Sequence, residues 1–369
     1  MNWNEKKLGF GLMRLPKDEN GKIIVEEVSR MADQYLAAGF TYFDTAYVYE
    51  GSEVAFREAV VKRYPRESYT IASKLPAWKI ADQYGPKEIF EESLQRCGVE
   101  YFDYYLLHSM QENREELYET TGCYEFVRRM KEEGKIRHIG FSFHGSPELL
   151  ERTLQRHPEM EFVQLQINYV DWDNELIATG RNYEIARKYG KDIVVMEPVK
   201  GGFLANVRND VREILDEADA EASAAALALR FAASLPGVKV VLSGMSSLAQ
   251  LEENVKLFAS FTPLEDAQMD VIRKAGQAIL NVPTVPCTSC RYCVEGCPMQ
   301  IKIPDIFSRF NMLLTFGEHF RPHGLYNDLV AAGSGRAGDC IGCGQCESVC
   351  PQHIDIIEQL AKASAQLDV

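Results

Sequence analysis

A regular alternation of strand-like and helical segments constrains the fold of this chain more than any other feature. Short apolar runs alternate with longer segments whose apolar residues recur at helical spacing. Eight strand-like runs are expected, at residues 8–13, 40–43, 69–73, 102–107, 136–142, 162–167, 193–196 and 238–242. Each is followed by a helical segment, and the series takes about 260 residues. This number and period favour an α/β fold, a (β/α)8 TIM barrel, over an open doubly wound sheet.

A barrel of this kind predicts where the catalytic groups lie, because they gather at the C-terminal ends of its strands. Asp44 directly follows the second strand-like run, and Tyr49 lies in the loop beyond it. Lys74 follows the third run, and His108 follows the fourth. We therefore expect these four side chains to meet at one end of the barrel.

These four side chains suit the reduction of a carbonyl group. A phenol has an unperturbed pKa of about 10, so Tyr49 becomes a usable acid near neutral pH only if a cation lowers its pKa. Lys74 supplies the cation, Asp44 neutralises and orients the lysine, and a neutral His108 can hydrogen-bond a substrate carbonyl. Taken singly, the aspartate, lysine and histidine could be a structural carboxylate, a salt-bridge partner and a core residue. Their order on successive strands favours catalysis.

The same residues resemble the aldo-keto reductases. The resemblance covers residues 8 to about 260 and rests on Phe43-Asp44-Thr45-Ala46, with Tyr49 five residues after the aspartate, on Ser73-Lys74 and on Leu106-Leu107-His108. It implies a TIM barrel, a nicotinamide cofactor (NADP or NAD) and reduction of a small aldehyde or ketone by hydride transfer, with the four residues in the roles just described. Relatives that reduce carbon–carbon double bonds carry glutamate where this chain has His108, so the histidine favours carbonyl reduction.

The resemblance also implies a set of cofactor-binding residues. Ser142, Gln164 and Asn168 match positions that hold the nicotinamide carboxamide and its neighbours. Glycine-rich turns after the seventh and eighth strands can receive the pyrophosphate; their residues are Lys200, Gly201, Gly202, Ser243, Gly244 and Ser246. Glu253 and Asn254 match the adenine-binding end.

Two further cofactor positions depart from the family pattern. Gln250 stands where many members carry an arginine that grips the 2'-phosphate of NADP, and Met196 stands where many stack an aromatic ring on the nicotinamide. Both departures weaken the preference for NADP over NAD. Each residue also has a structural interpretation, because Ser247-Leu248-Ala249-Gln250 fits a capping box and Met196 suits a core position.

The cysteines indicate a second domain, since eight of the ten lie between Cys287 and Cys350. They form two runs of the pattern Cys-x-x-Cys-x-x-Cys-x-x-x-Cys-Pro, a spacing that can wrap a 4Fe-4S cluster. In two-cluster ferredoxins the fourth cysteine of each run binds the other cluster. We therefore assign two ligand sets, Cys287, Cys290, Cys293 and Cys350 for one cluster and Cys340, Cys343, Cys346 and Cys297 for the second. Zinc is the alternative, but four cysteines packed this tightly exceed the short Cys-x-x-Cys elements that zinc sites pair.

The cysteine runs follow a proline-containing linker, Asn281–Pro286. We predict a barrel domain at residues 1–282 and a small, mainly helical, ferredoxin-like iron-sulfur domain at residues 283–369. Residues 303–316, between the two runs, look helical, and this insert resembles the helical type of two-cluster ferredoxin.

The composition excludes some classes of partner. The formal charge is -14 and the pI is near 5.1, whereas nucleic acids and anionic membranes require clustered cationic surface. The longest apolar stretch, Ala222–Leu235, is interrupted by serine and arginine and is too short to span a bilayer. The N-terminus lacks an apolar segment of signal-peptide length. We therefore expect a cytoplasmic protein whose cysteines serve metal binding or redox chemistry rather than disulfides.

The leading hypothesis is an NAD(P)H-dependent oxidoreductase that reduces a small carbonyl substrate. Its clusters could be structural, could sense oxygen or could carry electrons. A nicotinamide gives up two electrons together as hydride, whereas a cluster takes one, so direct exchange normally needs an intermediary such as a flavin, for which no motif is seen. The alternative is an electron-transfer protein whose barrel binds the cofactor and passes electrons through the clusters to a partner protein. A cofactor-binding regulatory subunit is a third hypothesis.

Overall fold

The structure is a computed structural model that describes residues 3, 6–81, 84–174, 177–281, 284–316 and 321–369. It divides into two compact units, Met1–Val199 with Ala226–Glu265 and Lys200–Ala225 with Asp266–Val369. The first unit holds the barrel strands, and the second holds both cysteine runs. The predicted domain boundary, between residues 282 and 283, lies outside the described residues and stays a prediction.

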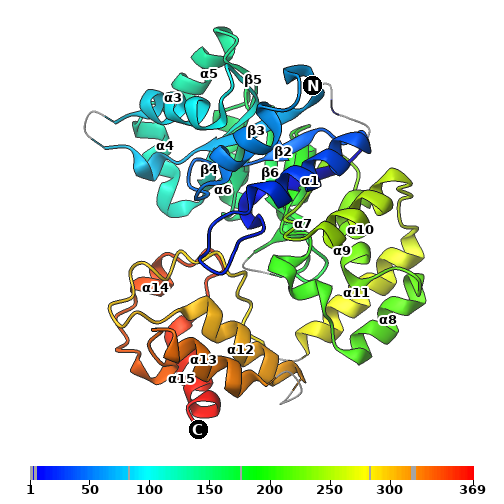
Figure 1. Cartoon of the computed structure of the whole chain (residues 1–369), viewed down its shortest axis with the longest axis vertical. Helices are drawn as coiled ribbons and strands as arrows, with labels where there is room; N and C mark the ends of the chain where they lie inside the picture. Colours follow the sequence, from blue (N-terminus) through cyan, green and yellow to red (C-terminus); the bar gives the residue numbers. More distant parts are fainter. Residues whose placement is uncertain (1–2, 4–5, 82–83, 175–176, 282–283, 317–320) are drawn as a thin grey trace. The chain divides into compact units, whose positions relative to one another are not determined.

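Eight parallel strands of the first unit form a closed barrel, in which each strand pairs with the next and β8 pairs with β1. Figure 1 labels β2 to β6 of this barrel. The strands are β1 (Leu8–Gly11), β2 (Tyr42–Asp44), β3 (Thr70–Leu75), β4 (Phe102–Met110), β5 (Ile136–Phe143), β6 (Phe162–Gln166), β7 (Asp192–Met196) and β8 (Val238–Ser243). Every strand overlaps a run predicted from the sequence, and the closed barrel confirms the predicted (β/α)8 fold.

Helices follow the strands, as the alternation predicts. The first unit contains α1 (Val25–Ala37), α2 (Ser52–Phe56), α3 (Pro86–Cys97), α4 (Glu115–Thr120), α5 (Cys123–Glu132), α6 (Pro147–Arg156), α7 (Thr179–Lys188), α10 (Leu248–Ala259) and most of α9 (Ala224–Ser234). The start of α6 shows the local cause. The Ser146 hydroxyl accepts a hydrogen bond from the Leu149 amide, and Pro147 takes the first helical position, where its missing N–H is not needed.

The period of two along each strand places the candidate site. A buried cluster fills the barrel with side chains from six strands, namely Tyr42, Ala72, Tyr104, Leu106, Phe162, Val194, Val240 and Leu242. Alternate residues of a strand share a face. Asp44 lies two residues after Tyr42, Lys74 two residues after Ala72, and His108 two residues after Leu106. The three side chains therefore lie above this cluster, at the carboxyl end of the barrel.

The second unit is helical. It contains α8 (Asn209–Asp219), α11 (Asp266–Leu280), α12 (Ile303–Phe316), α13 (Pro322–Ala331), α14 (Gln345–Ser348) and α15 (Ile356–Leu367). α12 coincides with the helix predicted between the cysteine runs. Buried residues of α12, α13 and α15 form a core around the cysteine loops, including Ile306, Phe307, Phe310, Tyr326, Ile356 and Leu360. Among the described helices of both units, none is long and apolar enough to cross a membrane.

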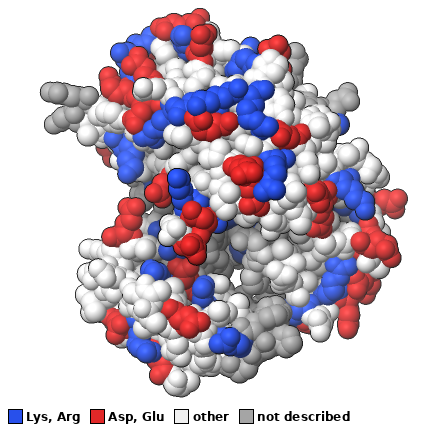
Figure 2. All heavy atoms as spheres, viewed as in Figure 1, with Lys and Arg blue, Asp and Glu red and all other residues white. Residues whose placement is uncertain are grey.

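Charged side chains of both signs are intermixed on the face shown in Figure 2. The ion pairs of the surface include Arg63, 2.8 Å from Asp33, and Arg152, 2.7 Å from Glu115. Exposed pairs of this kind contribute little to stability. The expectation that the chain has neither a nucleic-acid nor a membrane partner stays a prediction.

The Tyr35 hydroxyl joins the first two strands, because its oxygen lies 2.8 Å from the carbonyl oxygens of both Leu8 and Tyr42. In Tyr35→Phe these buried carbonyls lose their donor, so we expect the free energy of unfolding to fall by about 1–2 kcal/mol. Urea denaturation followed by circular dichroism measures the change. Tyr189→Phe is the control, since the Tyr189 hydroxyl accepts a hydrogen bond from Gln155 at the surface. Equal loss in the two variants would contradict the role of the buried hydroxyl.

Candidate functional site

Lys74 and Asp44 form a buried ion pair at the ends of β3 and β2. The Nζ atom of Lys74 lies 2.6 Å from Oδ1 of Asp44, and it donates a second hydrogen bond of 2.6 Å to the carbonyl oxygen of Thr45. The Lys74 and Asp44 side chains are only 1% and 4% exposed. Burial raises the pKa of Asp44, and the charge of Lys74 opposes that shift. The structure thus brings the predicted aspartate and lysine into direct contact.

Tyr49 lies beside this pair. Nζ of Lys74 is 5.0 Å from the centre of the Tyr49 ring, and the Tyr49 and His108 rings meet edge to face at a centre distance of 5.9 Å. We expected the lysine to lower the pKa of Tyr49, but the pKa is raised. Burial is the largest cause and the charge of Asp44 adds to it, while Arg14 opposes them. Tyr49 is therefore a neutral phenol, which can still protonate a much stronger base such as an alkoxide.

His108 is also neutral. Burial lowers its pKa well below the usual 6.5, and the charges of Lys74 and Arg114 lower it further. Its Nδ1 atom is buried and has no hydrogen-bond partner among the described residues. Trp78 lies 5.3 Å from the imidazole between ring centres, and Arg114 stacks on Trp78 at 3.8 Å. A neutral imidazole keeps one N–H group that can be donated to a ligand.

Gln164 and Ser142 offer polar atoms on the interior faces of β6 and β5. Oε1 of Gln164 is buried and has no hydrogen-bond partner among the described residues. The Ser142 oxygen accepts a 2.7 Å hydrogen bond from the Ser109 amide, so its own proton can be donated elsewhere. A buried amide oxygen without a partner is costly unless a ligand pairs with it. The amide group of a nicotinamide would do so, and these two residues therefore fit the predicted cofactor.

Asn168 and Met196 are engaged within the protein. The Asn168 side chain donates to the Asp171 carboxylate at 2.8 Å and to the Glu197 carbonyl at 3.3 Å, and its oxygen accepts from the amides of Val170 and Asp171. Met196 packs against the cluster inside the barrel. These contacts favour structural roles in the loops after β6 and β7, and contact with a cofactor stays a prediction for both residues.

The residues predicted after β8 are tied to the start of α10. The Ser243 hydroxyl oxygen accepts a 3.0 Å hydrogen bond from Asn254. Ser247 caps α10 by accepting from the Gln250 amide, and the Gln250 side chain in turn accepts a 2.7 Å bond from the Ser246 amide. This reciprocal capping supports the structural interpretation of Gln250.

The remaining predicted cofactor residues lie in different units. Glu253 is exposed on α10 of the first unit, whereas the turn Lys200–Gly202 belongs to the second. Lys200, Gly201 and Gly202 all have positive φ angles, of 47°, 66° and 97°. Glycine adopts such angles without steric cost, but Lys200 does not, so the surrounding contacts must hold it there.

Arg14 and Glu197 are charged residues at the carboxyl end of the barrel, and neither was among the site residues predicted from the sequence. Arg14 follows β1, close to Gly244, and its Nη2 atom lies 3.5 Å from Oε1 of Glu197, which follows β7. Their charges shift the pKa of Tyr49 in opposite directions, Arg14 downwards and Glu197 upwards. Both stand at strand ends, so the rule that selected Asp44 could also have found them.

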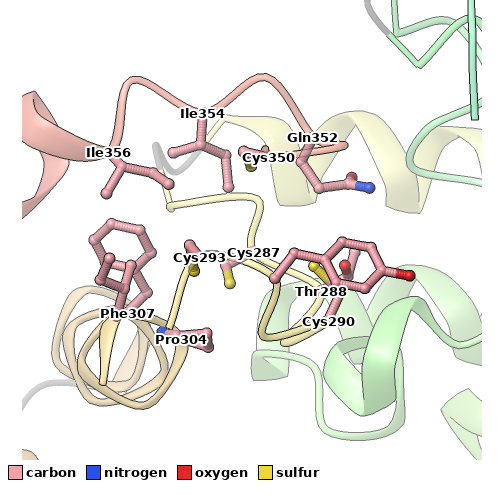
Figure 3. Close-up of a pocket in the computed structure, with 12 residues that line it drawn as sticks. Cys287, Thr288, Cys290, Cys293, Pro304, Phe307, Cys350, Gln352, Ile354 and Ile356 are labelled. Carbon is pink, nitrogen blue, oxygen red and sulfur yellow. The ribbon is translucent and has the colours of Figure 1, made fainter. Parts of the chain in front are cut away.

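Four cysteines, Cys287, Cys290, Cys293 and Cys350, line one cavity in the second unit (Figure 3). The first three come from one loop, and Cys350 comes from the segment before α15; Phe307, Ile354 and Ile356 close the cavity with apolar side chains. Burial raises the pKa of Cys287 and of Cys293 to about 12. Thiolates are unfavourable in such surroundings unless a bound cation offsets their charge, which suits metal ligands.

The other four cysteines, Cys297, Cys340, Cys343 and Cys346, line a second cavity. Each cavity thus combines three cysteines of one run with the fourth of the other run, in the crossed pattern predicted for two clusters. Among the described residues, no three Cys, His, Asp or Glu side chains converge closely enough to hold a single metal ion. The four cysteines of each set line one cavity, and four thiol ligands are the set that a 4Fe-4S cluster takes.

Comparison with known proteins decides the family. Residues 7–277 match the family model of the aldo/keto reductases. The chain belongs to the aldo/keto reductase family. Residues 286–354 match the model of the 4Fe-4S dicluster domain, so this aldo/keto reductase carries an iron-sulfur domain after its barrel.

Individual relatives resemble this aldo/keto reductase over its barrel. A probable aldo-keto reductase of Glycine max is 30% identical over 208 residues, 53% of this chain and 57% of that protein. The NADH-specific methylglyoxal reductase of Escherichia coli K12 is 26% identical over 284 residues, 65% of this chain and 85% of that protein. The holo form of a Bacillus halodurans aldo-keto reductase has a TM-score of 0.59 at 26% identity, covering 73% of this chain and 91% of the other. The chain spans about half the length of the first curated relatives, 57% of one and 45% of the next two.

The crossed ligand sets give a direct prediction. Cys297→Ala and Cys343→Ala should both lose the second cluster, so that iron falls from about eight to about four per chain. Cys290→Ala should lose the first cluster instead. EPR of the reduced proteins identifies the cluster that remains. A Cys297→Ala spectrum that matches Cys290→Ala rather than Cys343→Ala would contradict the crossed sets.

Proposed function

We propose that this aldo/keto reductase reduces an aldehyde or ketone with NADPH or NADH, and that Tyr49 donates the proton. The buried contact between Lys74 and Asp44 carries the proposal, because it fixes a charged pair directly beside the Tyr49 ring. When bound, the reduced nicotinamide supplies a hydride to the carbonyl carbon. The carbonyl oxygen then needs one proton to become a hydroxyl group, and Tyr49 supplies it.

The raised pKa of Tyr49 fits this role. The phenol is fully protonated before the reaction and can donate a hydrogen bond to the carbonyl oxygen. As negative charge develops on that oxygen, it becomes a stronger base than the Tyr49 phenolate, so the proton passes from Tyr49 to the oxygen. Lys74 then lies 5.0 Å from the ring that has become a phenolate, and its charge favours that state.

His108 is the second donor to the carbonyl oxygen in this proposal. Its lowered pKa keeps the imidazole neutral, so that its N–H polarises and orients the carbonyl without competing for the proton of Tyr49. Gln164 and Ser142 supply the polar atoms that would hold the nicotinamide amide group. The relative from Escherichia coli is named as NADH-specific, and Gln250 lacks the positive charge that would favour NADP, so NADH is as suitable a donor as NADPH.

A second candidate function is electron transfer through the clusters. The crossed cysteine cavities support it, since each provides four thiol ligands and the two share a single core. In that case NADPH or NADH would reduce the clusters without any carbonyl, and the visible absorbance of the anaerobic protein would bleach. Clusters that stay oxidised under excess NADPH and NADH would count against this function.

Removal of the phenolic proton tests the proposed reductase. In Tyr49→Phe we expect kcat for carbonyl reduction to fall at least about 100-fold, because a positioned general acid contributes about 10²- to 10⁴-fold. Nucleotide binding, measured by quenching of intrinsic fluorescence, should be unchanged. Tyr47→Phe is the matched control, because the Tyr47 hydroxyl hydrogen-bonds Tyr84 and Glu92 rather than Asp44, Tyr49, Lys74 or His108. Full turnover by Tyr49→Phe would remove Tyr49 from the mechanism.

The pKa shifts predict a broad pH profile. His108 works as a neutral hydrogen-bond donor, and its pKa lies below 6.5, so protonation and loss of activity occur only below that pH. Tyr49 works as a protonated acid whose pKa lies above 10, so deprotonation and loss occur only above that pH. We therefore expect kcat/KM to be nearly constant from about pH 6.5 to 10. A steep change centred within that range would show that one of the two groups titrates normally.

A further inference from the structure

A large cavity of the second unit is lined both by the turn after β7 and by the loop that carries the first cysteine set. The cavity measures about 1230 Å³. One wall is the turn Lys200–Gly202, which is predicted to receive the pyrophosphate of the nucleotide. Cys287 and Ser289, from the ligand loop of the first cysteine set, also line the cavity.

The turn and the ligand loop touch at Gly201. This residue has a φ of 66°, and a Cβ atom added there would lie 2.9 Å from the carbonyl oxygen of Thr288. Thr288 is 4% exposed and follows Cys287 directly. The loop continues with positive φ angles of 56° at Ser289 and 68° at Arg291. Non-glycine residues keep such strained angles only where the surrounding structure holds them.

The charges in this cavity suit an anionic ligand. Lys200 is 5% exposed at one side, and Arg208 and Arg212 also line the space. Asp210 and Asp216 offset part of this charge, since Asp210 pairs with Arg208 at 2.7 Å and Asp216 pairs with Arg212. One net positive charge remains among these five residues. A pyrophosphate group is the ligand of matching charge that the proposed reductase would bring to this turn.

We propose that the first iron-sulfur cluster holds one wall of the nucleotide-phosphate cavity, so that nucleotide binding and retention of this cluster stabilise each other. The inference rests on the proposed nicotinamide-dependent function. Ligation at Cys287 and Cys290 fixes the loop that carries Thr288, and this loop supports the turn at Gly201. Without the cluster the loop is no longer held at both ends, and the turn loses its support. Coupling between two binding events is reciprocal, so the nucleotide must protect the cluster to the same extent.

Two glycine variants test the contact, because both residues have positive φ but only Gly201 touches the ligand loop. Gly201→Ala introduces backbone strain and a clash with Thr288, whereas Gly333→Ala, after α13 of the same unit, introduces comparable strain with no atom within 4 Å of the new Cβ. The anaerobic full-length protein is mixed with a ferrous-iron chelator, with and without saturating NADPH or NADH. The release of iron and the dissociation constant of the nucleotide are both measured, and no carbonyl substrate is needed.

In the wild type we expect the nucleotide to slow the release of about half of the iron by about fivefold or more. Gly201→Ala should release that iron faster without nucleotide and should lose the protection, whereas Gly333→Ala should keep the wild-type values of both. The inference would be overturned if bound nucleotide left the rate of iron release unchanged. It would also be overturned if the two variants released iron at the same rate and were protected to the same extent. If the protein bound neither NADPH nor NADH, the proposed reductase function would be overturned as well. If the nucleotide bound and protected the cluster but no carbonyl compound were reduced, only the reductase function would be overturned.

Discussion

The buried contact between Lys74 and Asp44 is the interaction on which the candidate site depends. Removing both charges from water costs several kcal/mol per ion, and replacing such a pair with apolar residues is often neutral or stabilising. Stability alone therefore does not explain why the pair lies in the barrel. The lysine also donates to the Thr45 carbonyl, so one ammonium group links β3 to the loop after β2 that carries Tyr49. The proposed proton donor thus lies on a loop that the ammonium group of Lys74 ties to β3.

The surroundings of this ion pair also set the protonation states of Tyr49 and His108. Burial acts in opposite directions on the two uncharged groups, because it raises the pKa of the phenol of Tyr49 and lowers the pKa of the imidazole of His108. Both groups are consequently neutral donors over a wide pH range, a suitable state for groups that face a carbonyl oxygen. The proposed role of the iron-sulfur domain is separate from these protonation states. Its first cluster is proposed to be coupled to nucleotide binding through the turn at Gly201 and the cavity of the second unit.

Much of this arrangement could be predicted from the sequence because it follows from period and spacing. The eight apolar runs gave all eight strands, and the position of Asp44, Lys74 and His108 two residues after core positions put them on one face of the barrel. The repeated cysteine spacing led to the two crossed sets that line the cavities. The pKa of Tyr49 was predicted in the wrong direction, because the spacing of residues does not show how far desolvation and the charge of Asp44 outweigh the nearby cations. Arg14 and Glu197 were missed because their contact joins the first and seventh strands, and neither belongs to a motif. The packing of Gly201 on Thr288 also depends on a tertiary contact between distant segments.

The central claim is that the reduction occurs by direct hydride transfer at the Tyr49 site and not through the clusters. Anaerobic turnover with NADPH or NADH deuterated at both C4 positions tests this claim most directly. Direct transfer places one deuterium on the former carbonyl carbon of the product alcohol in ordinary water. Electrons that pass through one-electron clusters would arrive without that hydrogen, and the carbon would take its hydrogen from the solvent. Mass spectrometry that finds an unlabelled product would contradict the account.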